Sequence, residues 1–145
     1  MQGATVVERR RIEITTEADT DVHDLTPHAT EFVTESDVEE GQLLLFVAGS
    51  TAGITTVEFE SGCVADLGTL FEKIASSGAD YEHNRRWGDG NGYSHMRAAL
   101  LGPSLTVPIA EGRLLLGTWQ QIVLCDFDNR PRRRDVVMQV AGIGG

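Results

Sequence analysis

The chain has 145 residues, 41% of them hydrophobic, and a formal net charge of −10. That length suits one domain with its own core, and the acidic balance argues against a nucleic-acid partner, which would need a basic face. No stretch approaches the roughly eighteen consecutive apolar residues of a membrane-spanning helix, and the opening MQGATVVERRRIEI lacks the apolar core of a secretory leader. We therefore expect a cytoplasmic protein with no membrane partner.

The first part of the chain alternates between strand and helix patterns. An alternating segment predicts a strand over 6–16, and a Thr-Pro pair followed by apolar residues at helical spacing predicts a helix over 24–36. The apolar run QLLLFVAG (42–49) predicts a buried strand, and the β-branched ITTVEFE (54–60) predicts the next one.

The second part of the chain is dominated by strand patterns. An apolar stripe predicts a helix that begins near Val64 and is stopped by Gly78, and a short helix is expected over 94–101. Strands are predicted in three later segments, 104–109, 113–128 and 133–142. Because this order is not a strict βαβ alternation, we expect an α+β fold of a single domain over 1–145, with a mainly antiparallel sheet or sandwich and helices on one side.

The segment DGNGYSHMR (89–97) has features of a phosphate site. Its glycines permit left-handed backbone, so N–H groups can turn inward, and Ser94 can cap the helix that follows. A helix N-terminus offers unpaired N–H donors to an anion, and His95 and Arg97 lie in the first turn. A glycine-rich turn with an ordinary helix cap is the alternative.

The same segment also contains side chains that bind metals. Asp89, Asn91 and His95, with His83 upstream, form a nitrogen and oxygen set that a divalent metal could use, although the spacing matches no strict zinc motif. Near the end of the chain, Arg130 and the run 132–134 read either as a solvated surface or as a site that captures phosphate or carboxylate.

A longer signature indicates a family. Ser104, Gly112 and the block GTWQ (117–120) follow one another in the order typical of the YjbQ family, which is described as secondary thiamine-phosphate synthase. The resemblance covers nearly the whole chain and includes TAGIT (51–55), Glu58, HMRAALLGPSLTVPI around His95, and the closing RRRDVVMQVAG.

The resemblance implies a fold and an activity. The fold is a seven-stranded, two-sheet sandwich with flanking helices, assembled as a homotrimer. The activity joins hydroxymethylpyrimidine diphosphate to thiazole phosphate and releases pyrophosphate. Stabilising the leaving pyrophosphate would fall to Arg97, Arg113, the helix start at Ser94 and a divalent metal, Mg²⁺ or Zn²⁺.

The expected site residues fall into three groups. The catalytic residues would be Glu58, Asp89 and His95. The residues that bind substrate or its phosphate would be Gly49, Ser50, Thr51, Asn91, Ser94, Arg97 and Gln120. The metal ligands would be His83, Asp89 and His95.

The chain departs from the family at one position that matters for this assignment. Many members carry a histidine where this sequence has Gly49, so a metal or acid–base role for that histidine does not transfer. The alternative function is therefore a non-catalytic oligomeric protein that binds a metal or a phosphorylated metabolite. In either case we expect Trp119 to lie on a strand in the core or an interface. We also expect His95, Glu58 and Gln120, within one chain or between neighbouring copies, to converge on one cavity.

Overall fold

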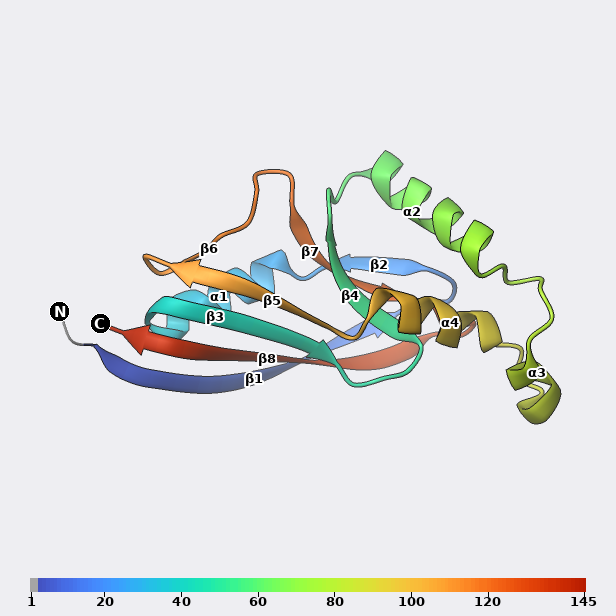
Figure 1. The fold of residues 1–145 in the computed structure, drawn as a ribbon, viewed down its shortest axis with the longest axis horizontal. Coiled ribbons are helices and arrows are strands. Elements are labelled where there is room, and N and C mark those ends of the chain that lie inside the picture. The colour runs from blue at the N-terminus through green and yellow to red at the C-terminus, as the bar shows by residue number, and fades with distance from the viewer. Residues whose placement is uncertain (1–2) are drawn as a thin grey trace.

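The computed structural model describes residues 3–145 and contains two antiparallel sheets and four helices in this range (Figure 1). The larger sheet has the strand order β1-β8-β3-β5-β6. Its strands are β1 (Ala4–Thr16), β3 (Val38–Val47), β5 (Ser104–Ala110), β6 (Arg113–Leu114) and β8 (Arg132–Gly144). The smaller sheet has the order β2-β7-β4, with β2 (Asp21–Asp24), β4 (Ala52–Val57) and β7 (Gln121–Asp126). The expected α+β class is confirmed, with eight strands in the described range where the resemblance implied seven.

The longest ladder joins β1 to β8 in antiparallel register from Ala4 opposite Gly144 to Thr16 opposite Arg132. Along much of both strands, more buried residues alternate with more exposed ones, the pattern of strands that bury one face. Strand β3 continues the sheet on the other side of β8, and β5 pairs with β3. This arrangement leaves the chain ends side by side at one end of the molecule (Figure 1).

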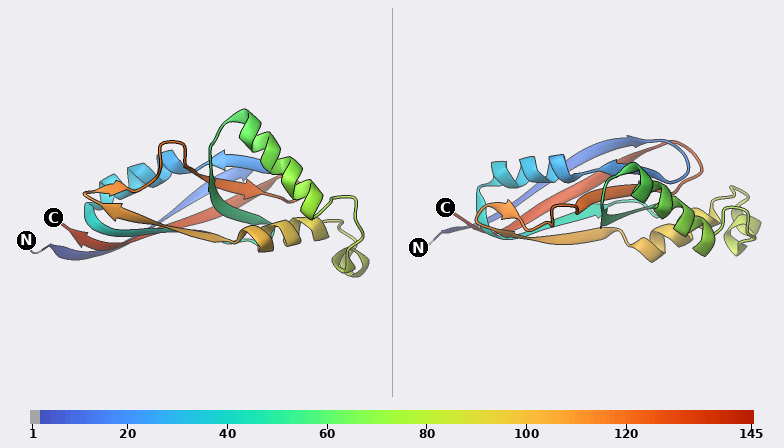
Figure 2. Two further views of the ribbon diagram at one scale, coloured as in Figure 1. Left: turned by 45° about the horizontal axis from the view of Figure 1, so that its top comes forward. Right: turned by 90° about the horizontal axis from the view of Figure 1, so that it is seen from above.

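Four helices accompany the sheets: α1 (Thr26–Ser36), α2 (Ser61–Ile74), α3 (Glu82–Trp87) and α4 (Gly92–Leu101). Helix α1 buries Ala29, Phe32 and Val33 in the main core, which lies between the two sheets. Helices α2 and α4 cover the other face of the smaller sheet, where Phe71 and Ala98 pack with Val123, Cys125 and Phe127 (Figure 2). The smaller sheet is therefore covered on both faces.

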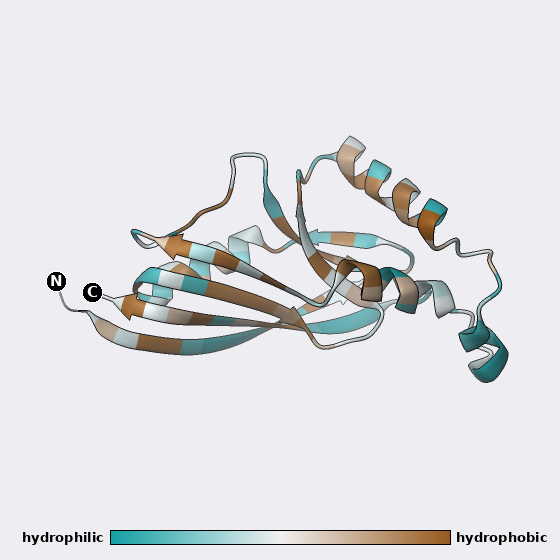
Figure 3. Ribbon diagram, viewed as in Figure 1, coloured by the Kyte–Doolittle hydropathy of each residue, from teal (hydrophilic) through white to brown (hydrophobic). Residues whose placement is uncertain are grey.

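The larger sheet keeps some apolar side chains exposed. Leu44 and Phe46 of β3, which alternate with the buried Leu43, Leu45 and Val47, remain partly exposed to solvent. Figure 3 shows how strongly apolar residues concentrate on the central strands of this sheet and along α2 and α4.

The segment predicted as one strand over 113–128 is interrupted. Strand β6 ends at Leu114, and a loop precedes β7. The loop contains Trp119, which is 73% exposed, so the expectation that Trp119 lies on a strand was wrong, as was its placement in the core of the chain. Gln120 closes this loop because its side-chain Oε1 accepts a hydrogen bond from the Gly117 N–H at 2.9 Å.

Two short elements were not predicted, β2 and α3. None of the helices within residues 3–145 has the length and apolar character needed to cross a bilayer.

Candidate functional site

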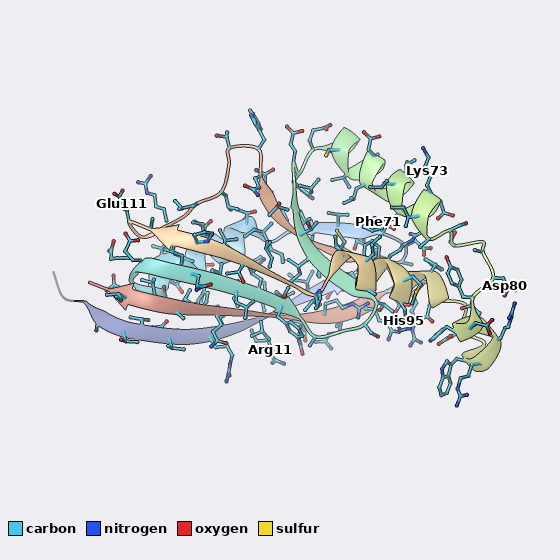
Figure 4. All side chains as sticks on the ribbon, viewed as in Figure 1. Arg11, Phe71, Lys73, Asp80, His95 and Glu111 are labelled. Carbon is cyan, nitrogen blue, oxygen red and sulfur yellow. The ribbon has the colours of Figure 1, made fainter. Side chains whose placement is uncertain are left out.

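A pocket of ≈ 350 Å³ lies between the turn that joins β3 to β4 and one side of α4. Its polar lining residues are Ser50 and His95, and Figure 4 labels His95 on α4 close to that turn. The remaining lining residues are small or apolar: Gly49, Ala52, Met96, Ala98, Ala99 and Pro103. The structure thus brings together Gly49, Ser50 and His95, which the sequence assigned to one site.

Helix α4 reaches this position because the TAGIT segment lets its end come close to β4. The Ile54 N–H donates to the Gly102 carbonyl at 3.0 Å, and a Cβ on Gly53 would lie only 2.8 Å from that same oxygen. The glycine in this segment therefore accommodates the end of a helix.

The start of α4 is buried instead of open to a ligand. The helix begins at Gly92, so Asn91 and not Ser94 is the N-cap residue. Asn91 Nδ2 donates to Asp128 Oδ1 at 3.3 Å, and Ser94 is fully buried, with no hydrogen-bond partner for its Oγ. Neither residue lines the pocket, so their expected contact with phosphate has no support in the geometry.

The proposed metal ligands gather beside the pocket without forming a metal centre. The rings of His83 on α3 and His95 have centroids 4.5 Å apart, and His83 Nδ1 lies 3.6 Å from Asp89 Oδ1. Among residues 3–145, however, no three His, Cys, Asp or Glu side chains converge closely enough to hold a metal ion. The residues present in a single chain therefore do not fit the expected divalent metal.

Arg97 is committed to the fold, which contradicts its expected role in binding phosphate. Its side chain is 3% exposed, and its Nη2 donates to Glu72 Oε2 at 2.6 Å while Nε donates to the Ala75 carbonyl at 3.0 Å. The guanidinium also lies over the Tyr93 ring. Its hydrogen bond holds the pKa of Glu72 below the ordinary value, so Arg97 ties α4 to α2.

Glu58 and Gln120 do not converge with His95 in one chain. His95 shares its pocket with Ala52, the first residue of β4, whereas Glu58 follows the last residue of that strand. At roughly 3.3 Å per residue, Glu58 lies about 20 Å from Ala52 along the strand. Gln120 lies at the same far end, where its Nε2 donates to Thr56 Oγ1 at 3.2 Å. Arg113 lines a different pocket, between α1 and β6.

A buried ionic cluster supports the floor of the site. Arg134 donates from Nε to Asp126 Oδ2 at 2.6 Å and from Nη2 to Asp126 Oδ1 at 2.8 Å. Asp128 accepts from Arg132 Nε at 2.6 Å and from Thr51 Oγ1 at 3.1 Å. Thr51, an expected substrate ligand, is therefore buried in this cluster and also accepts a hydrogen bond from Arg134.

The arginine run of this cluster stands out in the sequence, whereas its partners Asp126 and Asp128 lie in a separate segment. A sequence signal for the cluster exists, because Asp-x-Asp at and just after the end of β7 and Arg-x-Arg at the start of β8 each place two like side chains on one face. Burial would raise the pKa of Asp128, but hydrogen bonds from Arg132, Asn129, Asn91 and Thr51 outweigh it and hold that pKa below its ordinary value.

Known proteins resemble this chain in both sequence and fold. The chain matches the family described as UPF0047 protein YjbQ-like over residues 10–143. It is 38% identical to a UPF0047 protein of Methanothermobacter thermautotrophicus over 119 residues, which is 82% of this chain and 81% of that one. It is also 32% identical to the UPF0047 protein YugU of Bacillus subtilis over 135 residues, 92% of this chain and 98% of the relative.

Solved structures agree. A YbjQ-like protein from Sulfolobus solfataricus superposes with a TM-score of 0.91 at 30% identity, covering 96% of this chain and 99% of that one. A YjbQ/UPF0047 family protein from Clostridium acetobutylicum gives a TM-score of 0.82 at 32% identity, covering 90% and 98%. On its sequence and its fold, this chain belongs to the YjbQ-like UPF0047 family.

Proposed function

We propose that the pocket between the β3–β4 turn and α4 binds a small phosphorylated metabolite that carries a flat ring. The observation that carries the proposal is that one pocket joins Gly49 and Ser50 to His95, from two segments far apart in the chain. Its apolar wall of Ala52, Met96 and Ala99 suits the face of a ring, and its size falls in the range of small-molecule sites.

The reaction to test first is the one that the family resemblance implies. The thiazole nitrogen would attack the methylene carbon of hydroxymethylpyrimidine diphosphate, the C–O bond to the diphosphate would break, and pyrophosphate would leave. In this scheme the pocket holds the pyrimidine, and His95 donates a hydrogen bond to the leaving oxygen.

A non-catalytic binding protein is the second candidate, and specific observations favour it. Glu58 and Gln120 lie at the far end of β4 from His95, and Arg97 is held by Glu72. A neighbouring copy would have to supply an acid such as Glu58 to this pocket. The homotrimer implied by the resemblance is therefore part of the proposal, supported by the exposed Trp119 and by the partly exposed apolar residues of β3.

An assay of purified protein with both thiamine precursors and Mg²⁺ tests these alternatives. Thiamine phosphate is oxidised to a fluorescent thiochrome and quantified for the wild type, His95→Ala, and His28→Ala as a control at an exposed histidine on α1. Product that is lost only in His95→Ala supports catalysis. Saturable binding of the pyrimidine diphosphate without product, lost in the same variant, supports the binding protein. Absence of both product and binding in the wild type contradicts the proposed function.

A further inference from the structure

We propose that Arg134 is the anion-recognition residue of this pocket and that it reaches the ligand through the space that glycine leaves at position 49. The inference rests on the proposed function, in that it assumes a ligand in the pocket. It goes further by naming the group that recognises the ligand's phosphate or carboxylate. It also gives Gly49, the position where the family histidine is missing, a role of its own.

The guanidinium of Arg134 is fixed in place. Asp126 binds its Nε and Nη2, and the same Nη2 donates to Thr51 Oγ1. Both Asp126 and Thr51 are buried, so the fork cannot swing toward solvent. Within residues 3–145 the third nitrogen, Nη1, makes no hydrogen bond, although an arginine nitrogen is a strong donor.

That free nitrogen faces Gly49. A Cβ on Gly49 would lie 2.7 Å from Arg134 Nη1 and 3.7 Å from its Cζ. Any side chain at this position would therefore press against the guanidinium. Gly49 does not have the left-handed φ that would make glycine necessary for the backbone. Its absent side chain matters for the space that it leaves beside Arg134. Gly49 also lines the pocket, and the proposal places the ligand's approach to Nη1 at this residue.

The charges around Arg134 favour binding of an anion by a single directed hydrogen bond over attraction by a broad positive surface. Arg132 and Arg134 are balanced by Asp126 and Asp128, and the whole chain is strongly acidic. Anions therefore have no reason to gather at this surface unless a specific donor holds them. A guanidinium that two buried partners already orient needs little further ordering to bind an oxyanion.

The test uses inorganic phosphate and pyrophosphate as probes, titrated into the full chain by calorimetry. Gly49→Ala adds one methyl group 2.7 Å from Nη1 and so fills the space through which the ligand would reach Arg134. Gly68→Ala on α2 is the matched control, because a Cβ there meets only Thr20 Cγ2 at an ordinary 3.8 Å. We expect Gly49→Ala to weaken binding about tenfold to a hundredfold, the range for one hydrogen bond to a charged group, and Gly68→Ala to leave it unchanged.

Two results would overturn the subsite: a wild type that binds neither anion, or a Gly49→Ala variant that binds them as tightly as the wild type. If Gly49→Ala does not fold, guanidinium NMR of the wild type decides instead, because added phosphate must then shift the Arg134 resonances. Phosphate binding that depends on Gly49, without pyrimidine binding or product, would refute the proposed function and leave the subsite intact. Pyrimidine binding that Gly49→Ala does not weaken would refute the subsite alone.

Discussion

Replacing Asp128 with alanine should destabilise the fold more than any surface change, because this carboxylate is shared by several elements. It is fully buried at the end of β7 and accepts hydrogen bonds from Arg132 of β8, Thr51 of the β3–β4 turn, and Asn91, the N-cap residue of α4. Its removal leaves donors from three parts of the chain without their acceptor.

The cost can be estimated from those donors. Thr51 and Asn91 are buried, and a buried polar group that loses its partner costs about 1–3 kcal/mol. Arg132 is about one-third exposed, so water can replace much of its lost contact. We therefore expect Asp128→Ala to lower the free energy of unfolding by about 3–4 kcal/mol, within the range measured when one partner of a buried ion pair is removed.

Urea unfolding followed by circular dichroism measures this change, at one fixed protein concentration because assembly would shift the midpoint. Arg133→Ala is the matched control, since that arginine makes an exposed ion pair with Glu13 and its loss should leave the midpoint unchanged. If Asp128→Ala unfolds at the same urea concentration as Arg133→Ala, then the cluster does not join these elements and the reasoning fails.

Three further outcomes are expected. Because the pKa of Asp128 is held below its ordinary value, its ionised form stabilises the fold above pH about 4. The stability gap between the wild type and Asp128→Asn should therefore close as the pH falls through the lower, folded-state pKa in acid-unfolding curves. If the chain assembles as the proposed homotrimer, Trp119→Ser should reduce the particle mass seen by light scattering without changing the circular dichroism spectrum, and an unchanged mass would contradict a role for Trp119 in the interface. Burial raises the pKa of Cys125 to about 12, so a thiol reagent at pH 8 should modify Cys63 first and Cys125 only after denaturant is added; equal rates would contradict its burial.

Most of the fold could be predicted from periodicity, because the long elements bury one regular face. Strands β1, β3, β5 and β8 and helices α1 and α2 lie close to their predicted ranges. Strand β2 could not be predicted, because its four residues show no hydrophobic alternation and it forms by pairing with β7, which is distant in the sequence. Helix α3 was missed because its sequence EHNRRW has no apolar stripe, and it ends where Gly88 takes a left-handed conformation.

The site was harder to predict because motifs identify residues without giving the distances between them. Gly49, Ser50 and His95 were placed together, but Glu58 and Gln120 belong to the other end of β4. A side chain on a short helix can also turn inward: Arg97 faces α2 and pairs with Glu72, a partner that no local spacing reveals. Sequence periodicity predicts which residues of a helix or strand share a face. Which other element packs against that face depends on the tertiary fold.

The placement of charge in this molecule determines how its stability depends on ionic strength. The aspartate–arginine cluster around Asp126 and Asp128 is buried, so dissolved ions screen it little, while many of the remaining carboxylates of this acidic chain lie at the surface and repel one another. Added salt therefore relieves the exterior repulsion and leaves the interior contacts intact. Salt also screens exposed ion pairs such as Arg133–Glu13, but these contribute little to stability. Concentrated electrolyte should therefore favour the folded state of this protein.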